Sequence, residues 1–407
     1  MNQYRHSLIA FLVFLIVFQT AVIAIVGLDR PLWIDEEHFV QTIRQFGEGI
    51  SPTLLKHYNE MSTPLPFILY ALWGRLFGFD IHVLRILSVI IALATYLCFH
   101  RLLSMVLDNS RVVFLAAVFL VIHPYMIGFS IFVYTDMLPI FLVILAFVFV
   151  FSRNAIGFGI ASACALLCRQ YYVFLPLAAV LFSLAGIFPA QNRARPPAGF
   201  ALKMFVASLL SPAPLGLLML YWQGPAPQNE FSRSYLAQGL SFHPSHVTLY
   251  ISLLFIYLLP IVLVYGRRLY ENRVVLIISL CASFLYWSAP VGVSRIATTA
   301  GIETVGLLHR FLRSIWSIEV FAQTIFYLGF LLGLPIVLTA AKDTYQRLRN
   351  RDLTFPLFLD LCILAFLMVM PFSYLAWEKY FMPLVPLASI RILLTDYERQ
   401  RGNPGAV

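Results

Sequence analysis

The sequence predicts an all-α membrane protein that crosses the bilayer many times. Hydrophobic residues make up 60% of the 407 residues, charged residues make up 12%, and the mean hydropathy is +0.84. Soluble globular chains carry about twice this charged fraction. A hydrophobic run from Leu8 to Gly27 is long enough to cross a hydrocarbon core of about 30 Å as a helix. We therefore expect a bundle of transmembrane helices.

The hydropathy pattern predicts about twelve spans, with eleven to thirteen as the range. The first is not expected to be a cleaved signal peptide, because many apolar segments follow it. The expected spans are 8–27, 83–103, 112–130, 137–152, 155–170, 171–188, 200–222, 246–265, 273–290, 319–340, 354–374 and 380–395. Two of them, 137–152 and 155–170, are short, and the Pro-containing segment 171–188 could be re-entrant. Residues 1–407 are expected to form a single transmembrane domain.

The distribution of Lys and Arg predicts the orientation. Arg5 precedes the first span, so the N-terminus is expected in the cytoplasm, and the loops on that side then hold most of the basic residues. The basic clusters are Arg193, Arg195 and Lys203; Arg267, Arg268 and Arg273; and Lys342, Arg347, Arg349 and Arg351. We interpret them as topology signals, and no nucleic-acid partner is expected. The compact loops favour a bacterial inner membrane. A protein of the endoplasmic reticulum would show the same charge distribution, with the lumen as its outer side.

Cysteine and histidine spacing does not indicate a disulfide framework or a zinc site. Cys98, Cys164, Cys168, Cys281 and Cys362 all fall inside predicted spans and are expected to pack as small apolar residues. The histidines His38, His57, His243 and His246 show no metal spacing on one helix and are expected to line a polar site rather than to bind a metal.

The first outer loop, residues 28–82, carries three consecutive carboxylates in Asp35-Glu36-Glu37. Neighbouring carboxylates raise one another's pKa, so a substrate, a cation or a proton is expected to use them. Two stretches at helical spacing follow, Asp35–Phe46 and Pro64–Phe77. Both are too short or too polar to span, so we expect two helices in the plane of the membrane interface. Glu60 lies between them.

Later outer segments add polar residues to the same face. Asp136 ends the connection before the fourth span, and Arg169-Gln170 interrupts an apolar run where an arginine needs an anionic partner. The late outer loop, residues 291–318, and the last outer turn supply the basic residues Arg295, His309, Arg310, Arg313 and Lys379. Acids suit an acceptor hydroxyl that needs a base, and cations suit a phosphate leaving group.

These residues resemble the motifs of C-type (GT-C) membrane glycosyltransferases, and most closely the dolichyl-phosphate-glucose α-1,2-glucosyltransferase family. The segments that carry the resemblance are 31–39, 123–125, 132–136 and 169–170, with weaker matches at 242–246 and 378–383. The chain departs from the glucosyl branch at Glu36-Glu37-His38, and it has Asp136 where that branch usually has Glu. The sugar and the acceptor therefore stay open.

The resemblance implies an inverting transfer of a hexose, with glucose as the first candidate, from a polyprenyl-phosphate-sugar to an acceptor hydroxyl on the periplasmic or lumenal face. The acceptor could be a glycan, a lipid-linked saccharide or a protein. Asp35 is the implied general base, and Glu36 is expected to orient the acceptor or to tune Asp35. No cofactor is expected beyond the lipid-linked donor, and a divalent cation stays open because clustered acids can bind one.

The remaining site residues have predicted roles with named alternatives. Asp136 and Glu60 are expected to contact the acceptor, and the predicted contacts to the donor and its phosphate are Arg169, Gln170, Arg310, Lys379 and Tyr380. Asp35 and Asp136 could instead be helix caps, Glu60 a solvated loop acid, and Arg310 a residue that faces lipid headgroups. A transporter, a lipid-linked-sugar flippase and a non-catalytic scaffold are the rival classes.

Overall fold

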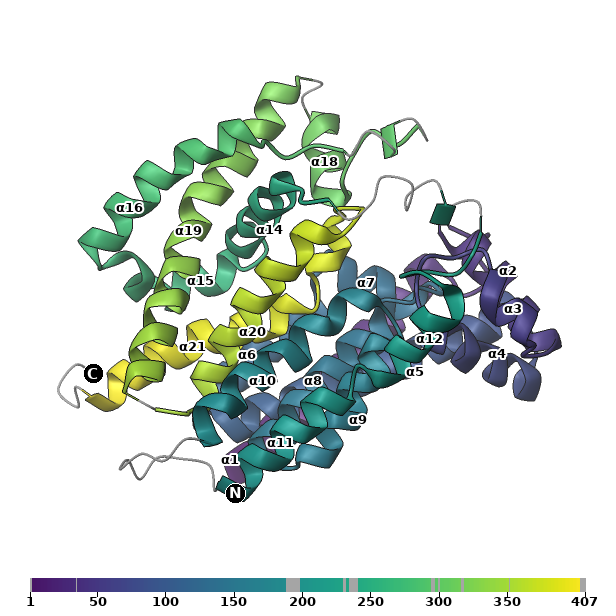
Figure 1. Cartoon of the computed structure of the whole chain (residues 1–407), viewed down its shortest axis with the longest axis horizontal. Coiled ribbons are helices and arrows are strands. Elements are labelled where there is room, and N and C mark those ends of the chain that lie inside the picture. The colour runs from purple at the N-terminus through teal and green to yellow at the C-terminus, as the bar shows by residue number, and fades with distance from the viewer. Residues whose placement is uncertain are drawn as a thin grey trace. The chain divides into compact units, whose positions relative to one another are not determined.

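The structure, a computed structural model, describes residues 2–33, 35–187, 198–229, 232–233, 241–293, 297–298, 301–315, 318–350 and 352–402. In this part of the chain every regular element is a helix, so the predicted all-α class is confirmed. The chain divides into two compact units, one of Met1–Tyr172 and Val206–Ala237 and the other of Val173–Phe205 and Gln238–Val407. Figure 1 labels their helices. Of the predicted basic clusters, Arg193, Arg195 and Arg351 lie outside the described residues.

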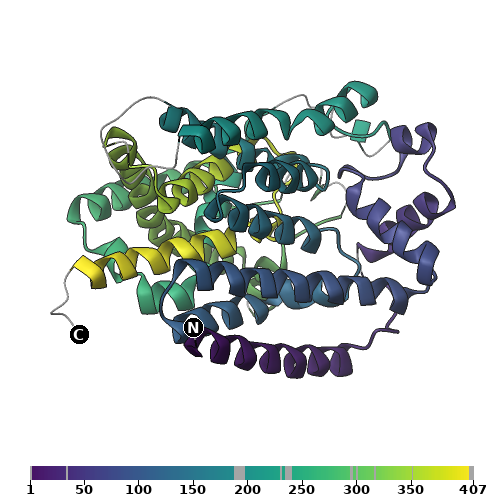
Figure 2. The same ribbon diagram turned by 90° about the horizontal axis from the view of Figure 1, so that it is seen from below.

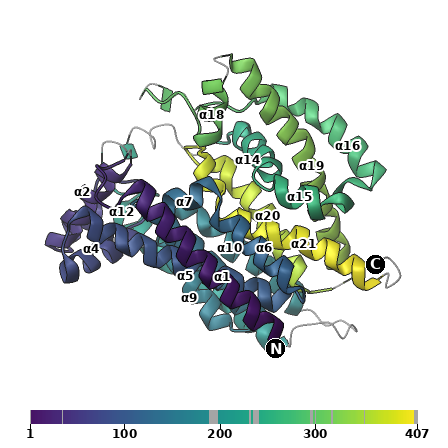
Figure 3. The same ribbon diagram turned by 180° about the vertical axis from the view of Figure 1, so that it is seen from behind.

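The first unit holds the N-terminal helices and the first outer loop. Its helices are α1 (Asn2–Val26), α2 (Glu36–Glu48), α3 (Pro52–His57), α4 (Leu65–Phe77), α5 (Ile81–Val106), α6 (Ser110–Val121), α7 (Pro124–Ile131), α8 (Met137–Phe151), α9 (Ala155–Leu166), the 3₁₀ helix η1 (Gln170–Val173) and α12 (Ala213–Trp222). The helix α11 (Ala198–Leu210) contributes residues to both units. Figure 3 shows α1 and α5 lying along each other.

The second unit holds the C-terminal helices. They are α10 (Phe174–Ile187), α14 (Pro244–Ile256), α15 (Leu259–Tyr265), η2 (Arg267–Tyr270), α16 (Arg273–Ser283), η3 (Phe284–Ser288), α18 (Leu307–Ile315), α19 (Glu319–Arg349), α20 (Phe355–Val369), η4 (Met370–Phe372), η5 (Glu378–Phe381) and α21 (Leu384–Gly402). The long helix α19 packs on α14, α16 and α20.

Each unit has a helix at its centre. In the first unit, α8 packs between α5 and α9, and its sequence MLPIFLVILAFVFVF contains no charged residue. Residues such as Ile140, Val143 and Phe147 are fully buried there. In the second unit, α20 packs against α10, α19 and α21 in the same way. Helices without a polar stripe can be covered by protein on all sides, which explains their central positions.

Two glycines bring α14 and α19 close together in the second unit. A Cβ atom at Gly333 would lie 2.1 Å from the carbonyl oxygen of Ile251, and one at Gly329 would lie 3.0 Å from that of Ser252. These two glycines are one turn apart on the same face of α19. Small residues at this spacing let helix backbones approach each other in membrane proteins.

The structure confirms the integral membrane class, but it does not confirm a count of about twelve spans. Among the described residues, five helices are long and apolar enough to cross a membrane, and two bent helix pairs raise this number to seven. The five are Arg5–Val26, Ile81–Val106, Gly199–Trp222, Glu319–Arg349 and Phe355–Phe372. The predicted spans 137–152 and 155–170 correspond to the shorter apolar helices α8 and α9.

Both bent pairs break next to a proline. The predicted span 112–130 is bent by 66° between α6 and α7, and the span 246–265 is bent by 58° between α14 and α15. Pro124 begins α7, and Pro260 lies in the first turn of α15. A proline has no N–H to donate, and its ring clashes with the carbonyl four residues earlier. The preceding helices accordingly end at Val121 and Ile256.

The two amphipathic helices predicted in the first outer loop are present as α2 and α4. The apolar face of α2, formed by Phe39, Val40, Ile43 and Phe46, is buried, and α2 packs against α4. In contrast, α4 exposes Leu72, Leu76 and Phe77. Protein therefore covers the face of α2 that was expected to touch lipid, whereas α4 keeps an apolar surface.

Candidate functional site

Asp35 lies directly before the first residue of α2. Its backbone angles are helical (φ −69°, ψ −14°), and among the described residues its side chain makes no capping hydrogen bond. The side chain is 31% exposed. The structure thus places a partly exposed carboxylate at this position and does not support the alternative of a helix cap.

Glu36 is fully buried and forms an ion pair with Arg85 of α5, which is also fully buried. Arg85 Nη2 lies 2.7 Å from Glu36 Oε2, and Arg85 Nε donates to Oε1 at 3.1 Å. The same carboxylate accepts hydrogen bonds from the backbone N–H groups of Trp33 (2.9 Å) and Val133 (2.7 Å). Glu36 therefore ties together three segments around Asp35. Its surroundings suit a positioning role better than contact with an acceptor.

Arg85 is a site residue that the sequence analysis missed. Besides its ion pair, it donates to the backbone carbonyls of Leu28 (2.9 Å), Arg30 (2.6 Å) and Pro31 (3.3 Å). The signal for it was present, because a single arginine near the start of an apolar helix needs an anionic partner. Its effect is to fix the chain between α1 and Asp35.

Glu60 and Asp35 both interact with His38, which lies in the first turn of α2. Glu60 Oε1 is 2.6 Å from His38 Nδ1 and accepts a hydrogen bond from Thr42 Oγ1 at 3.5 Å. His38 Nε2 is 4.0 Å from Asp35 Oδ1. Burial alone would lower the pKa of His38, but its hydrogen bond to Glu60 and the negative charges of Glu60 and Asp35 outweigh burial and raise the pKa to about 9. A protonated imidazole therefore links Asp35 to Glu60 at neutral pH.

The loop that carries Glu60 is held by residues from distant parts of the first unit. Asn229 Nδ2 donates to the carbonyls of Tyr58 (2.8 Å) and Glu60 (3.2 Å). Gln170 Nε2 donates to the carbonyls of Met61 (2.7 Å) and Pro225 (3.1 Å). Gln170, expected to contact the donor, thus supports this loop, and Glu60 itself is buried rather than solvated.

Asp136 and Arg169 form a second buried ion pair in the first unit. Arg169 Nη2 lies 3.2 Å from Asp136 Oδ1, and it donates to Oδ2 at 3.3 Å and to Thr135 Oγ1 at 2.9 Å. Asp136 precedes α8, yet within the described chain its side chain makes no capping hydrogen bond to that helix. The anionic partner that Arg169 requires is therefore Asp136.

Arg310, Lys379 and Tyr380 belong to the second unit. Arg310 is exposed on α18, whereas Lys379 and the buried Tyr380 lie in η5. A shared site of these three residues with the acids of the first outer loop would lie between the two units, and it stays a prediction. Arg295 lies outside the described residues.

The fully buried Glu378 anchors α18 in the second unit. Its carboxylate accepts the backbone N–H groups of Leu308 and His309, each at 2.8 Å, and the hydroxyl of Tyr257 at 2.7 Å. Carboxylates are favoured at helix N-termini because they pair with the N–H groups that have no partner inside the helix. The motif 378–383 pointed to this region, but Glu378 was not among the predicted site residues.

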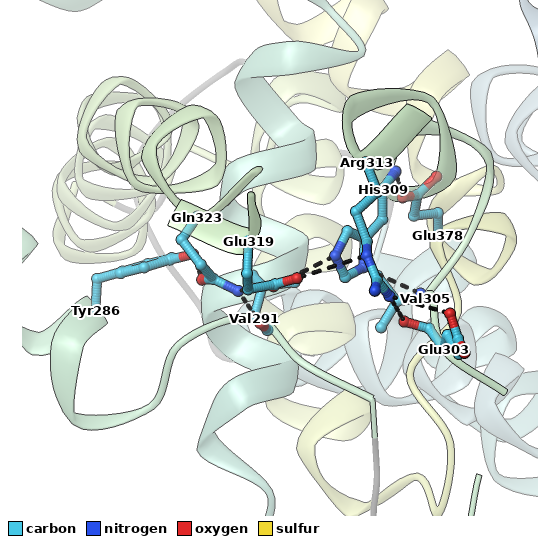
Figure 4. Close-up of polar contacts among 9 residues, drawn as sticks. All are labelled: Tyr286, Val291, Glu303, Val305, His309, Arg313, Glu319, Gln323 and Glu378. Carbon is cyan, nitrogen blue, oxygen red and sulfur yellow. Dashed lines mark hydrogen bonds and ion pairs between the residues drawn. The ribbon is translucent and has the colours of Figure 1, made fainter. Parts of the chain in front are cut away.

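Ion pairs of Arg313 and a contact of His309 link α18 to Glu303 and Glu319 (Figure 4). Arg313 lies 3.6 Å from Glu303 and 3.8 Å from Glu319, and His309 Nε2 lies 3.5 Å from Glu319. Burial lowers the pKa of His309, which favours its neutral form. Arg310, on the same helix, is exposed.

Within the described parts of the chain, no three His, Cys, Asp or Glu side chains form a group that could hold a metal ion. The divalent cation that the sequence left open stays untested.

Comparison with known proteins adds a family and two structures. The sequence profile of the DIE2/ALG10 family matches residues 34–200. This range contains Asp35, Glu36, Glu60, Asp136 and Arg169, so the resemblance to the dolichyl-phosphate glucosyltransferases is confirmed for this part of the chain and supports a membrane glycosyltransferase. A search of curated proteins gave no match.

The similar solved structures are two crystal structures of ArnT from Cupriavidus metallidurans. The apo state is 14% identical with a TM-score of 0.42, and the state bound to undecaprenyl phosphate is 15% identical with a TM-score of 0.43. Each alignment covers 97% of this chain and 79% of the ArnT chain.

Proposed function

We propose that this protein is an inverting glycosyltransferase. It would move a hexose, with glucose as the first candidate, from a polyprenyl-phosphate-sugar to an acceptor hydroxyl at the periplasmic or lumenal face of the membrane. The observation that carries the proposal is the family match over residues 34–200, which contains the acid cluster around Asp35. We place the protein in a bacterial inner membrane with both termini in the cytoplasm.

In the proposed reaction, Asp35 removes the proton from the acceptor hydroxyl as its oxygen attacks the anomeric carbon. The new carbon–oxygen bond forms opposite the bond to phosphate, so the anomeric centre is inverted and polyprenyl phosphate leaves with the bonding electrons. The partial exposure of the Asp35 carboxylate supports this role, because an acceptor can reach it. The phosphate is already a good leaving group, so removing the proton and stabilising the phosphate charge are the main tasks.

The other residues support this step in proposed roles. Glu36 acts through its ion pair with Arg85, which holds the backbone between α1 and Asp35. Asp136 contacts acceptor hydroxyls, and Arg169 shares its guanidinium between Asp136 and the donor phosphate. Arg310, Lys379 and Tyr380 are proposed further contacts to the donor.

The decisive experiment compares Asp35→Asn with Glu37→Gln in protein reconstituted into lipid, with a panel of polyprenyl-phosphate-sugars as donors. Glu37 is the matched control because it is the exposed neighbouring carboxylate on α2. A general base contributes about 100-fold or more to a rate, so we expect Asp35→Asn to lose at least that much transfer while Glu37→Gln keeps the wild-type rate. Both variants must insert into the membrane normally.

Two results would contradict the proposal at different levels. Full transfer by Asp35→Asn would remove Asp35 as the base and leave the enzyme class standing. No transfer by the wild type with any donor of the panel would contradict the enzyme class, and transport or flipping of a lipid-linked sugar would then be assayed in the same vesicles.

A further inference from the structure

His38 is placed between two carboxylates that come from different segments. One is Asp35, three residues earlier and on the same side of α2, with 4.0 Å between Oδ1 and His38 Nε2. The other is Glu60, from the loop between α3 and α4, with 2.6 Å between Oε1 and His38 Nδ1. Both ring nitrogens are therefore directed to an acid, and the ring orientation is determined by the geometry.

The polar side chains around His38 donate hydrogen bonds to Glu60 or to backbone carbonyls, and the positive charge beside the two carboxylates is that of the His38 imidazole. From α2, Thr42 donates to Glu60, and from the Glu60 loop the hydroxyl of Tyr58 donates to the carbonyl of Ser62. Arg44 of α2 and Arg75 of the adjacent α4 donate to the carbonyls of Phe79 and Gly47, at the C-terminal end of α2. These two arginines therefore bind backbone at that end of α2, whereas His38 lies within 4.0 Å of both carboxylates in the first turn.

The two carboxylates differ in exposure, and this difference suggests different tasks. The side chain of Glu60 is 8% exposed, whereas that of Asp35 is 31% exposed. Asn229 and Gln170 hold the backbone beside Glu60, so Glu60 is a fixed anchor. Of the two carboxylates, Asp35 is the one that an acceptor can reach, and the His38 side chain between them is 46% exposed. A buried anchor, a bridging imidazole and a partly exposed acid form an arrangement in which the middle group orients the outer one.

We propose that His38, clamped by Glu60, is a positioning residue that keeps Asp35 ionised and aimed at the acceptor hydroxyl. This inference rests on the proposed function of Asp35 as the base. It gives Glu60 a task through His38 in place of the expected contact with the acceptor. A cation close to an acid favours its ionised form, and a hydrogen-bonded ring restricts its direction. The pKa of about 9 for His38 supports the protonated bridge at neutral pH.

The test measures kcat and KM for transfer across a range of pH with the full-length protein in lipid. We expect His38→Gln to lower kcat and to move the acidic limb of its pH profile upward by about one pH unit or more, because Asp35 loses its adjacent cation. His38→Lys keeps a cation and should keep the limb near the wild-type position. Glu37→Gln serves as the control for removing a charge from the same turn, and its profile should match the wild type.

Glu60→Gln separates anchoring from acceptor binding. We expect a lower kcat with an acceptor KM close to that of the wild type, because Glu60 acts through His38. A raised acceptor KM with an unchanged kcat would overturn the inference and restore direct acceptor contact. A wild-type limb and kcat in His38→Gln would overturn it as well.

Failure of this inference differs from failure of the proposed function. In the first case Asp35→Asn is inactive while His38→Gln behaves as the wild type. In the second case Asp35→Asn stays active, or the wild type transfers no sugar. The bridge of Asp35, His38 and Glu60 can also be tested without measuring sugar transfer. If the bridge carries a charge, the pH dependence of unfolding should differ between the wild type and His38→Gln. The absence of that change would overturn the bridge even in a protein without measurable transfer.

Discussion

Three consecutive carboxylates with the same chemistry have three different environments. Glu36 is fully buried against Arg85, Asp35 is partly exposed, and Glu37 is exposed. Helical geometry causes the difference, because neighbouring residues on a helix point about 100° apart. A cluster that looks uniform in the sequence thus supplies one structural ion pair, one candidate base and one surface charge.

The first prediction concerns the buried ion pair. Glu36→Gln should lower the free energy of unfolding by about 3–5 kcal/mol, because it leaves the charge of Arg85 buried without its counter-ion. The double variant Glu36→Met with Arg85→Met should lose less, since it removes both charges together. Chemical unfolding in detergent measures the effect, with Glu37→Gln as the control. Equal stability of Glu36→Gln and Glu37→Gln would show that the pair does not stabilise the fold.

The second prediction concerns the pH dependence of stability at His38. Its pKa rises from 6.5 to about 9 on folding, so the folded state binds this proton more tightly than the unfolded state. The stabilisation is therefore fully present below about pH 6.5 and is lost as the pH rises through about 9. The Tm difference between the wild type and His38→Gln should be larger at about pH 6 than at about pH 10. A difference independent of pH would mean that His38 packs without carrying a charge.

Sequence reasoning found the acids of the site more readily than their partners. Asp35, Glu60 and Asp136 stand out because charges are rare in a chain this apolar. Arg85 was missed, and His38 was expected only to line a polar site. Arg85 falls inside the predicted span 83–103, and the role of His38 as a bridge depends on Glu60, which lies 22 residues away in the sequence. Arg85 lies 49 residues from Glu36 in the sequence, and His38 lies 22 residues from Glu60. Such contacts depend on tertiary packing, which the periodicity of the sequence does not encode.

At the scale of elements, hydropathy predicted where apolar helices lie better than how long they are. The long spans at α1, α5, α19 and α20 agree with the expected segments. The bends at Pro124 and Pro260 were not predicted, although proline is a known helix breaker, because a hydropathy window averages over single residues. Apolar helices of 10–17 residues also satisfy such a window without being long enough to span by themselves.

The third prediction concerns the contact between α14 and α19. Gly333→Ala should lower the free energy of unfolding by about 1–3 kcal/mol or more. The added Cβ would lie 2.1 Å from the carbonyl oxygen of Ile251. A backbone atom cannot move aside as a flexible side chain can. Gly216→Ala in α12 is the matched control, since in the described part of the chain no atom lies within 4 Å of the added Cβ. Thermal unfolding of the two variants compares them. Equal Tm values would show that the two helices can separate without cost.

At the scale of the whole molecule, the described apolar helices and the family match support an integral membrane protein, while its orientation rests on the distribution of charge. In the first unit, two hydrogen bonds show which helix ends lie together. Ser7 Oγ donates to the carbonyl of Ser110, which joins the start of α1 to the start of α6. Arg85, near the start of α5, donates to the carbonyl of Leu28, just after the end of α1. The 26 residues of α5 make it about 39 Å long at about 1.5 Å per residue. Figure 2 shows α1, in dark purple, running away from the N-terminus toward the helices of the first outer loop.

Acidic residues outnumber basic ones in the first outer loop, residues 28–82, which lies at one of these ends. Arg5 and Arg111 lie at the end that contains the N-terminus, whereas Asp35, Glu36 and Glu37 lie at the other end, beyond α1. Arginines near span ends favour the cytoplasmic side, so the acid cluster should face the periplasm or lumen. A site on that face fits a donor whose sugar is presented outside the cytoplasm, which ties the proposed chemistry to the orientation.

The last prediction tests this orientation with two single cysteines in the same unit. Both positions are exposed, so Glu37→Cys and Arg111→Cys should each be reactive once a reagent can reach them. A membrane-impermeant maleimide added to intact cells or sealed right-side-out vesicles should label Glu37→Cys, because the proposed orientation places this end of the unit outside the cytoplasm. Arg111→Cys should be labelled only after permeabilisation. The wild type provides the background from the exposed Cys281. Labelling of Arg111→Cys from outside, with Glu37→Cys protected, would reverse the orientation and place the Asp35 site in the cytoplasm.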